Sequence, residues 1–307
     1  MCNILFVNNT KHLCGVHQYG FNIGNTIIKS PKYNFIYIES EADEEVHKYI
    51  RDFYPKIIIY NYHSFTLSWA QFIIDRYKDI RHLSIIHEPL DYPNNLDGTI
   101  SQDPTIIETN NHFKTGRLIF DYINNFSLPK ILTIGSFGFP QEDKGYLRII
   151  NQVKEEFNEA IIRFHIPFSW VVDPSGRMGD ELINKCLELL KETNIKLEIS
   201  REWMSLQDLL NWLAKNTINV FFYDTKEGRG ISGPPDFALS VQRPIALTKS
   251  YMFRHLLNTN PSICIEDLSL KEIIDNGIKP LEEFYNIWSE NDIIKDYERI
   301  IERILNV

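Results

Sequence analysis

The sequence predicts two α/β domains, each built on a parallel sheet flanked by helices. Three observations predict this fold class. At 307 residues, the length suggests about two domains. Short apolar runs alternate with amphipathic stretches of helical length, as in sheets built from right-handed crossovers. The alternation breaks between residues 88 and 128 and restarts at 130, which indicates a linker between two halves.

The first half contains runs rich in Ile, Val, Phe and Tyr that are short enough to be buried strands. They are NILFVN (3–8), NFIYIE (34–39), KIIIYNY (56–62) and HLSIIH (82–87). Helices are expected near 17–29, 43–53 and 66–78. The stretch EPLDYPNNLDGTISQDP that follows is heavy in Pro, Asn, Asp and Gly, and YINNFSLP is typical of a linker.

The second half repeats the alternation. Strands are expected at 130–135, 160–166, 195–199, 218–223 and 244–247. Helices are expected at 144–157, 178–192, 205–215, 234–241 and 269–277. In SLQD, Ser205 can cap a helix and Asp208 can reach back to complete a capping box. The predicted domains are residues 1–127 and 128–290, followed by a C-terminal helix at 291–307.

The last segment, NDIIKDYERIIERILNV, carries one apolar stripe. Ile293, Tyr297, Ile300 and Ile304 recur at spacings of four, three and four, which indicates one buried face of a long helix. This helix could cover its own domain or run back to the first domain, and the pattern leaves both open.

Composition excludes several classes of function. A net charge of -9 argues against nucleic acid as the main partner, because duplex-binding proteins usually present a basic face. The four cysteines, which have no CxxC spacing, fit a reducing compartment. No segment carries about 18 apolar residues in a row, and MCNILFVN is typical of a strand and not of a signal peptide. We expect a cytoplasmic protein without a transmembrane segment, with peripheral membrane contact left open.

Parallel sheets bind ligands beyond the carboxyl ends of their strands, so the loops after each strand are the candidate site. In the first half, Gly15 precedes a helix whose N-terminus would favour an anion, although a glycine in a tight turn is about equally expected. His87 ends a strand in SIIHEP and could contact a substrate or carry a proton. A histidine satisfied by the backbone is the more common case.

Two loops of the second half are rich in glycine. GSFGFPQEDKGYLRIINQV begins at Gly135 and brings Lys144 to a helix start, where it could neutralise a diphosphate, although a solvated lysine is common. The later loop contains EGRGISGPPD, which runs from Glu227 to Asp236. Its glycines, including Gly230, permit backbone N–H groups to point at a ligand. Asp236 could accept hydrogen bonds from a ribose diol or interact with the helix dipole.

The order of these stretches resembles the retaining glycosyltransferases of the GT-B fold, especially glycosyltransferase family 4. GSFGFPQEDKG and KEGRGISGPPDFALSVQRPIAL are similar to the family's donor-domain motifs, and CGVHQYG and IIHEP to its first glycine loop and strand-end histidine. The resemblance implies two Rossmann-like domains facing a central cleft. It implies His87 and Glu227 as catalytic residues. It implies donor binding by a group of residues, which are Gly15, Gly135, Lys144, Arg229, Gly230, Ile231, Ser232 and Asp236.

The implied activity is transfer of a sugar from a nucleotide-diphosphate sugar to a hydroxyl acceptor, a glycan for preference, with retention and without a metal or other cofactor. No Asp-x-Asp triplet occurs in the chain, which agrees with metal independence. Ser136 and Phe137 stand where the family usually has an arginine, and the spacing from Glu227 to Asp236 is one residue longer than usual. Two alternatives therefore stay open: a degenerate protein that binds nucleotide sugar or glycan without turnover, and a nucleotide-sugar epimerase.

Overall fold

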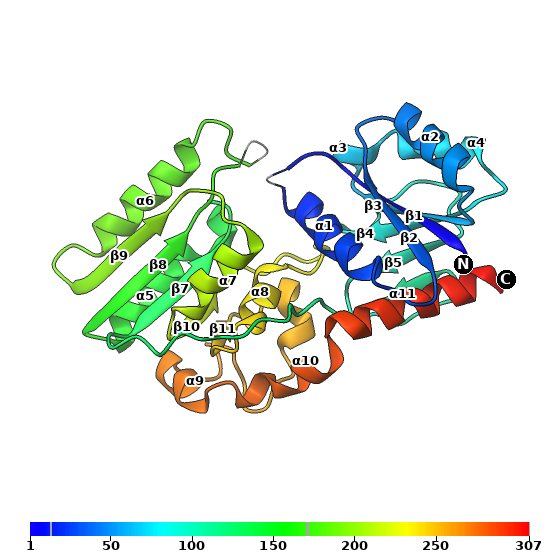
Figure 1. Ribbon diagram of the computed structural model, residues 1–307. Helices are drawn as coiled ribbons and strands as arrows, with labels where there is room; N and C mark the ends of the chain where they lie inside the picture. The colour runs from blue at the N-terminus through cyan, green and yellow to red at the C-terminus, as the bar shows by residue number, and fades with distance from the viewer. Residues whose placement is uncertain (13, 170–171, 307) are drawn as a thin grey trace. The chain divides into compact units, whose positions relative to one another are not determined.

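The computed structural model describes residues 1–12, 14–169 and 172–306, which form two compact units (Figure 1). The first unit comprises Met1–Leu118, Gly228–Gly230 and Ile287–Val307. The second comprises Ile119–Glu227 and Ile231–Asn286. Each unit contains one parallel sheet, so the α/β class predicted from the sequence is confirmed.

The first unit is built on a six-stranded sheet. In sheet order its strands are β2 (Asn34–Glu39), β1 (Asn3–Asn8), β3 (Ile57–Tyr62), β4 (Arg81–Ile86), β5 (Gly98–Ser101) and β6 (His112–Lys114). Its helices are α1 (Gly15–Ile27), α2 (Asp43–Phe53), α3 (Ser64–Leu67), α4 (Ala70–Arg76) and α11 (Glu290–Leu305). Leu5 and Val7 of β1 pack with α2, α3 and α4, while Ile4 and Phe6 are buried on the opposite face, where α1 lies. Burial on both faces explains why the strands are continuous apolar runs.

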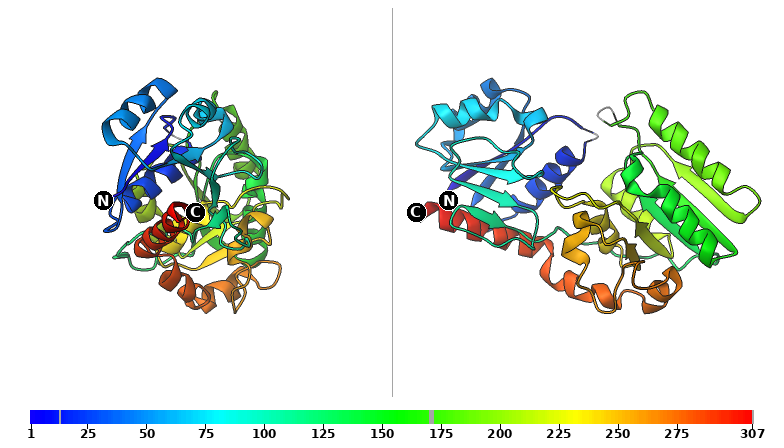
Figure 2. Two further views of the ribbon diagram at one scale, coloured as in Figure 1. Left: turned by 90° about the vertical axis from the view of Figure 1, so that its right-hand side faces the viewer. Right: turned by 180° about the vertical axis from the view of Figure 1, so that it is seen from behind.

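The second unit is built on a five-stranded sheet. In sheet order its strands are β11 (Ile245–Leu247), β10 (Ile218–Phe221), β7 (Thr133–Phe137), β8 (Glu159–His165) and β9 (Asn194–Ser200). Its helices are η1 (Glu142–Lys144), α5 (Tyr146–Glu156), α6 (Arg177–Leu189), α7 (Leu206–Ala214), α8 (Pro234–Ser240), η2 (Tyr251–Leu256), α9 (Leu270–Asn276), η3 (Lys279–Leu281) and α10 (Glu282–Ile287). One core cluster joins α5, α6 and α9 to the sheet, and another gathers around α7. The right-hand view of Figure 2 shows the second unit from behind.

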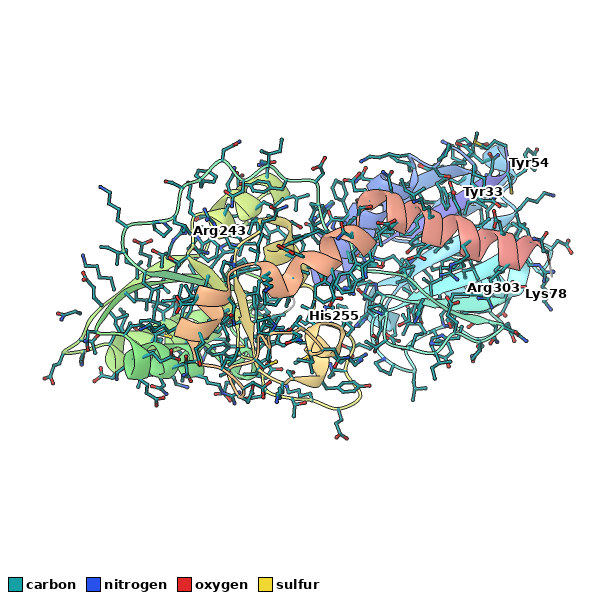
Figure 3. All side chains as sticks on the ribbon, turned by 90° about the horizontal axis from the view of Figure 1, so that it is seen from below. Tyr33, Tyr54, Lys78, Arg243, His255 and Arg303 are labelled. Atoms are coloured by element: carbon teal, nitrogen blue, oxygen red, sulfur yellow. The ribbon has the colours of Figure 1, made fainter. Side chains whose placement is uncertain are left out.

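Helix α11 packs on the first unit, beside α1. All four residues of the predicted apolar stripe are buried, together with Ile294 and Ile301. Ser30 donates a hydrogen bond to Glu298 (2.5 Å), and Glu108 accepts from Arg299 and Arg303 (2.9 and 3.0 Å). Figure 3 labels Arg303, whose guanidinium lies 4.6 Å from the Phe113 ring centroid.

Several sequence predictions need correction. The region 88–128 also contains β5 and β6, which are short and mix polar with apolar residues. The single helix expected at 66–78 is two helices, α3 and α4. Ser205 caps α7 by accepting from the Asp208 N–H (3.1 Å), but Asp208 contacts the Ser205 hydroxyl (2.7 Å) instead of its backbone N–H.

Among the described residues, none of the helices combines the length and the apolar character that a membrane span requires.

Candidate functional site

In the second unit, β7 and β10 are neighbours, so the loops that follow them leave the same edge of the sheet. The first of these loops carries Lys144 in η1. Gly145, the next residue, has φ of +69° and is the N-cap of α5. A Cβ at this position would lie 1.9 Å from the Phe222 carbonyl oxygen, so the turn is pressed against the chain leaving β10. Lys144 is thereby held beside the second loop.

Tyr223 is the meeting point of these two loops. The Lys144 ammonium lies 3.9 Å from the centroid of its ring. Burial raises the pKa of the Tyr223 hydroxyl, and a side-chain interaction with Ser232 opposes that rise. Thr248 donates a hydrogen bond to the Tyr223 carbonyl oxygen (2.6 Å). The second unit thus places Lys144 over the Tyr223 ring, and Ser232 lies close enough to influence the pKa of the Tyr223 hydroxyl.

Sequence reasoning missed Tyr223 as a site residue. It is the second residue after β10, in INVFFY, where the apolar run predicts a buried strand over 218–223. A tyrosine at the carboxyl end of a mostly apolar strand is the signal that could have found it, because its hydroxyl needs a polar partner when buried.

The glycine-rich loop after β10 places its predicted residues in different surroundings. Glu227 is exposed in a turn. Ile231 is buried, and the Ser232 N–H donates to the Met252 carbonyl oxygen (3.0 Å). Asp236 lies in the first turn of α8, buried, with its carboxylate 3.4 Å from Nε2 of buried His255, which Figure 3 labels.

Gly135 lies inside β7 and not in the loop beyond it. A Cβ there would lie 1.9 Å from the Asn216 amide nitrogen and 2.9 Å from the Asn219 amide oxygen. The two asparagines are hydrogen-bonded to each other (2.7 Å) and buried. This close approach of side chains is a sufficient reason for a glycine in the strand.

His165 is a second strand-end residue that the sequence analysis did not single out. It ends β8, and its Nδ1 lies 3.1 Å from the Ser200 hydroxyl at the end of β9. Burial lowers the pKa of His165 to about 4, so the ring is neutral at pH 7.

A cavity of about 260 Å³ opens at the start of α5, between α5 and α6. Gly145, Arg148, Lys185 and Glu181 are among its lining residues. It lies on the α6 side of the turn that carries Lys144, and its walls carry charges of both signs.

In the first unit, Gly15 is the first residue of α1, and a Cβ there would meet nothing within 4 Å. The first turn of α1 contains no acidic residue and receives no side-chain cap from Cys14, within the described part of the chain. These backbone N–H groups and the helix dipole favour an anion.

His87 follows β4 and belongs to a polar network. The Gln102 amide nitrogen donates to Nδ1 (2.9 Å), and Nε2 lies 2.7 Å from the Asn61 amide oxygen. Arg117 donates to the Gln102 side chain (2.8 Å), and Asn61 donates to Asn8 (2.7 Å). Because an amide NH₂ only donates, Nδ1 must accept and Nε2 carries the proton.

The network keeps His87 neutral. Burial lowers its pKa to about 3, and the charges of His63 and Arg117 act in the same direction. Both ring nitrogens have partners, so the ring has no lone pair directed at a substrate proton in this arrangement. Asn61 also donates to the Val16 carbonyl oxygen (2.7 Å), which links His87 to the first turn of α1.

Arg229 and Gly230 group with the first unit. An Arg229 nitrogen lies 2.8 Å from a carboxylate oxygen of Glu88, and the Gly230 N–H donates to the other oxygen (3.3 Å). A Cβ at Gly230 would lie 2.0 Å from the His87 carbonyl oxygen. The structure therefore places both residues beside His87 and Glu88, and Gly230 is fixed by a close backbone approach.

Known proteins resemble this chain in structure but not detectably in sequence. No protein-family profile matches the chain, and no curated protein sequence matches it significantly. A glycosyltransferase from Rickettsia africae is 13% identical, with a TM-score of 0.68 over 99% of this chain and 98% of that one. Anabaena HepE in complex with UDP-glucose is 10% identical, with a TM-score of 0.65 over the whole of both chains. The N-terminal domain of trehalose-6-phosphate phosphatase from Candida albicans is 9% identical, with a TM-score of 0.70 over 99% of this chain and 97% of that one.

These similarities establish the fold. The chain has the two-domain GT-B fold, as the sequence resemblance implied. One of the three neighbours is named a glycosyltransferase, one was solved with UDP-glucose, and one is named for a phosphatase. The fold by itself therefore does not fix the activity.

Proposed function

We propose that the protein transfers a sugar from a nucleotide-diphosphate sugar to a hydroxyl acceptor, with a glycan as the preferred class of acceptor. The observation that carries the proposal is the position of Lys144 over the Tyr223 ring, at the edge of the sheet where β7 and β10 end. The fold shared with HepE, which was solved with UDP-glucose, supports a nucleotide sugar as the donor. Membership of family 4 is part of the proposal.

In this proposal, Lys144 neutralises the leaving diphosphate. The ammonium of a lysine is a compact charge that suits phosphate oxygens, and its place over the Tyr223 ring positions it at the loop edge. The charge is then balanced by the protein itself, and we propose that no metal is required for transfer. Asp236 remains the proposed ribose contact, and its pairing with His255 would orient the carboxylate.

We further propose that transfer retains the anomeric configuration. An inverting enzyme needs a base to deprotonate the acceptor, and His87 was the candidate in the first unit. Its two ring nitrogens are engaged with Gln102 and Asn61, and its low pKa makes it a weak base, which supports a positioning role. A front-face route needs no such base, because the departing phosphate can take the acceptor proton.

A binding protein without turnover is the second candidate. It is favoured by the exposed position of Glu227, which the resemblance assigns to catalysis. A screen of nucleotide sugars by thermal shift tests donor binding for both candidates, because a ligand that binds the folded form raises its stability. We expect at least one nucleotide sugar to raise the Tm. A flat response across UDP, GDP, ADP and dTDP sugars would contradict the transferase and a nucleotide-sugar-binding protein, and would leave a glycan-binding protein.

A further inference from the structure

Three side chains suited to a metal converge in the first unit, apart from the residues assigned to the donor. His12 lies between β1 and α1, His17 lies in the first turn of α1, and Glu39 ends β2. Among residues 1–12, 14–169 and 172–306, these form the one group of at least three His, Cys, Asp or Glu side chains whose ligand atoms lie within 4.8 Å of one another. We propose that this group binds a divalent transition-metal cation of the Zn²⁺ class.

The spacing of the three side chains fits such an ion. Nε2 of His17 lies 3.0 Å from one oxygen of Glu39, and Nε2 of His12 lies 3.6 Å from the other. The two imidazole rings are neighbours, with centroids 4.3 Å apart. A tetrahedral ion with bonds of about 2.1 Å holds its ligand atoms roughly 3.4 Å apart. Small side-chain rotations therefore suffice to place all three on one ion.

Two of the ligands are already held in place. His17 is buried, and the backbone that carries it belongs to α1, where its carbonyl oxygen accepts from Asn8 (3.0 Å). The Tyr37 hydroxyl donates to Glu39 (2.7 Å) and itself accepts from Asn8 (2.9 Å). Partners of this kind orient metal ligands and strengthen metal affinity. His12 is exposed and supplies the adjustable third ligand.

The ligand types select the class of cation. Two imidazoles and one carboxylate suit Zn²⁺, Ni²⁺ or Cu²⁺, whereas Mg²⁺ and Ca²⁺ require a shell of oxygen atoms. Three protein ligands leave a coordination position for water or another small ligand. The ligands come from three parts of the unit: His12 precedes α1, His17 lies in α1 and Glu39 lies in β2. The bound ion would therefore link His12 to the helix and to the sheet.

The metal site contains none of the residues assigned to the donor, although Gly15, one of those residues, lies two positions before His17 in α1. Its residues belong to the first unit, while the diphosphate is assigned to Lys144 in the second. Zinc binding is measured without a nucleotide, so its outcome is distinguishable from that of the donor screen.

Calorimetry with ZnCl₂ on the full chain tests the proposal, with MgCl₂ as the comparison cation. We expect one Zn²⁺ per chain and no comparable Mg²⁺ binding. His12→Ala should weaken Zn²⁺ binding at least tenfold, roughly the lower bound seen when even an indirect partner of a metal ligand is removed. This variant alters an exposed side chain, so it leaves the fold intact. Glu39→Gln should weaken binding as well, because it removes a charged ligand.

His47→Ala is the matched control. His47 lies in the same unit, with Nε2 3.6 Å from the Asp43 carboxylate, but it forms a pair and not a group of three. We expect the Zn²⁺ affinity of His47→Ala to equal that of the parent. The proposal is overturned if the parent binds no Zn²⁺, if His12→Ala and Glu39→Gln bind as tightly as the parent, or if His47→Ala loses as much affinity as they do.

Discussion

Lys144 is the residue on which donor binding depends most in this account. A charged hydrogen bond contributes about 1.5–3 kcal/mol, so Lys144→Ala should weaken the binding of the nucleoside diphosphate by roughly ten- to a hundredfold. Calorimetry with the nucleotide found in the screen measures the change. Lys154→Ala is the control, because Lys154 lies in the last turn of α5 and its ammonium donates to the Leu189 carbonyl oxygen. Equal affinities in the two variants would remove Lys144 from the site.

His165 should make the second unit less stable in acid. Its pKa is about 4 in the folded protein, below the usual value of 6.5, because the ring is buried. The unfolded chain therefore binds the extra proton first, and stability is present above pH 6.5 and lost as the pH falls towards 4. The loss is about 1.4 kcal/mol per pH unit, or about 2 kcal/mol between pH 7 and pH 5.

Urea unfolding of the parent and two variants at both pH values tests this. In His165→Gln, which cannot take up the proton, the difference in unfolding free energy between pH 7 and pH 5 should be smaller by about 2 kcal/mol. Ser200→Ala removes the neighbouring hydroxyl but leaves the imidazole buried, so it should keep the pH dependence of the parent. If all three proteins respond to pH alike, His165 does not carry the effect.

The turn between β7 and α5 needs a glycine at position 145 for two reasons, a positive φ and close packing against Phe222. Gly228 has the positive φ without the close packing, so it serves as the comparison. Both glycines have positive φ, +69° and +74°. At Gly228 a Cβ would meet nothing within 4 Å, so Gly228→Ala should lower stability by about 1 kcal/mol from backbone strain alone. At Gly145 the Cβ would also strike the Phe222 carbonyl oxygen, so Gly145→Ala should lower stability by roughly 2–4 kcal/mol. Urea midpoints measure both, and equal losses would mean that the turn is not packed as described.

Helix α11 should contribute to the stability of the first unit as a core element. Ile300 is fully buried on its apolar face, so Ile300→Ala should lower the free energy of unfolding by about 2–5 kcal/mol. Lys295 lies in the same helix with a side chain that is 74% exposed, and Lys295→Ala should change it by less than about 0.5 kcal/mol. A similar small effect of both variants in urea unfolding would indicate that α11 is not packed on the unit in solution.

The elements that sequence analysis found are those with strong, local patterns. The strands β1 and β2 and the helix α2 lie where the apolar runs and amphipathic period predicted them. The strands β5 and β6 were missed because four and three residues of mixed polarity give no clear period. The partner of α11 could not be predicted, because an apolar stripe does not say which surface covers it.

For the candidate donor site, the sequence predicts which residues each loop contributes but not which residues of different loops become neighbours. Lys144 and Ser232 were named from their loops, but their common neighbour Tyr223 depends on β7 and β10 being adjacent in the sheet. Glu39 follows His17 by 22 positions, so no local spacing reveals the three-ligand group. His87 has two side-chain partners, Asn61 in β3 and Gln102 just after β5. Only the folded sheet brings these residues together.

The proposed function requires that the protein break the bond between sugar and diphosphate in a nucleotide sugar. Proton and phosphorus NMR of one reaction mixture tests it. The parent, Lys144→Ala and Lys154→Ala are each incubated with the donor found in the screen, UDP-glucose first, and with a mixture of oligosaccharides whose hydroxyl groups, or water, accept the sugar. We predict release of the nucleoside diphosphate, a sugar product whose fresh anomeric signal has the donor's configuration, and slower release by Lys144→Ala alone. An intact nucleotide sugar in the presence of bound protein would contradict transfer and indicate a binding protein, and a nucleotide sugar with a changed ring configuration would indicate an epimerase.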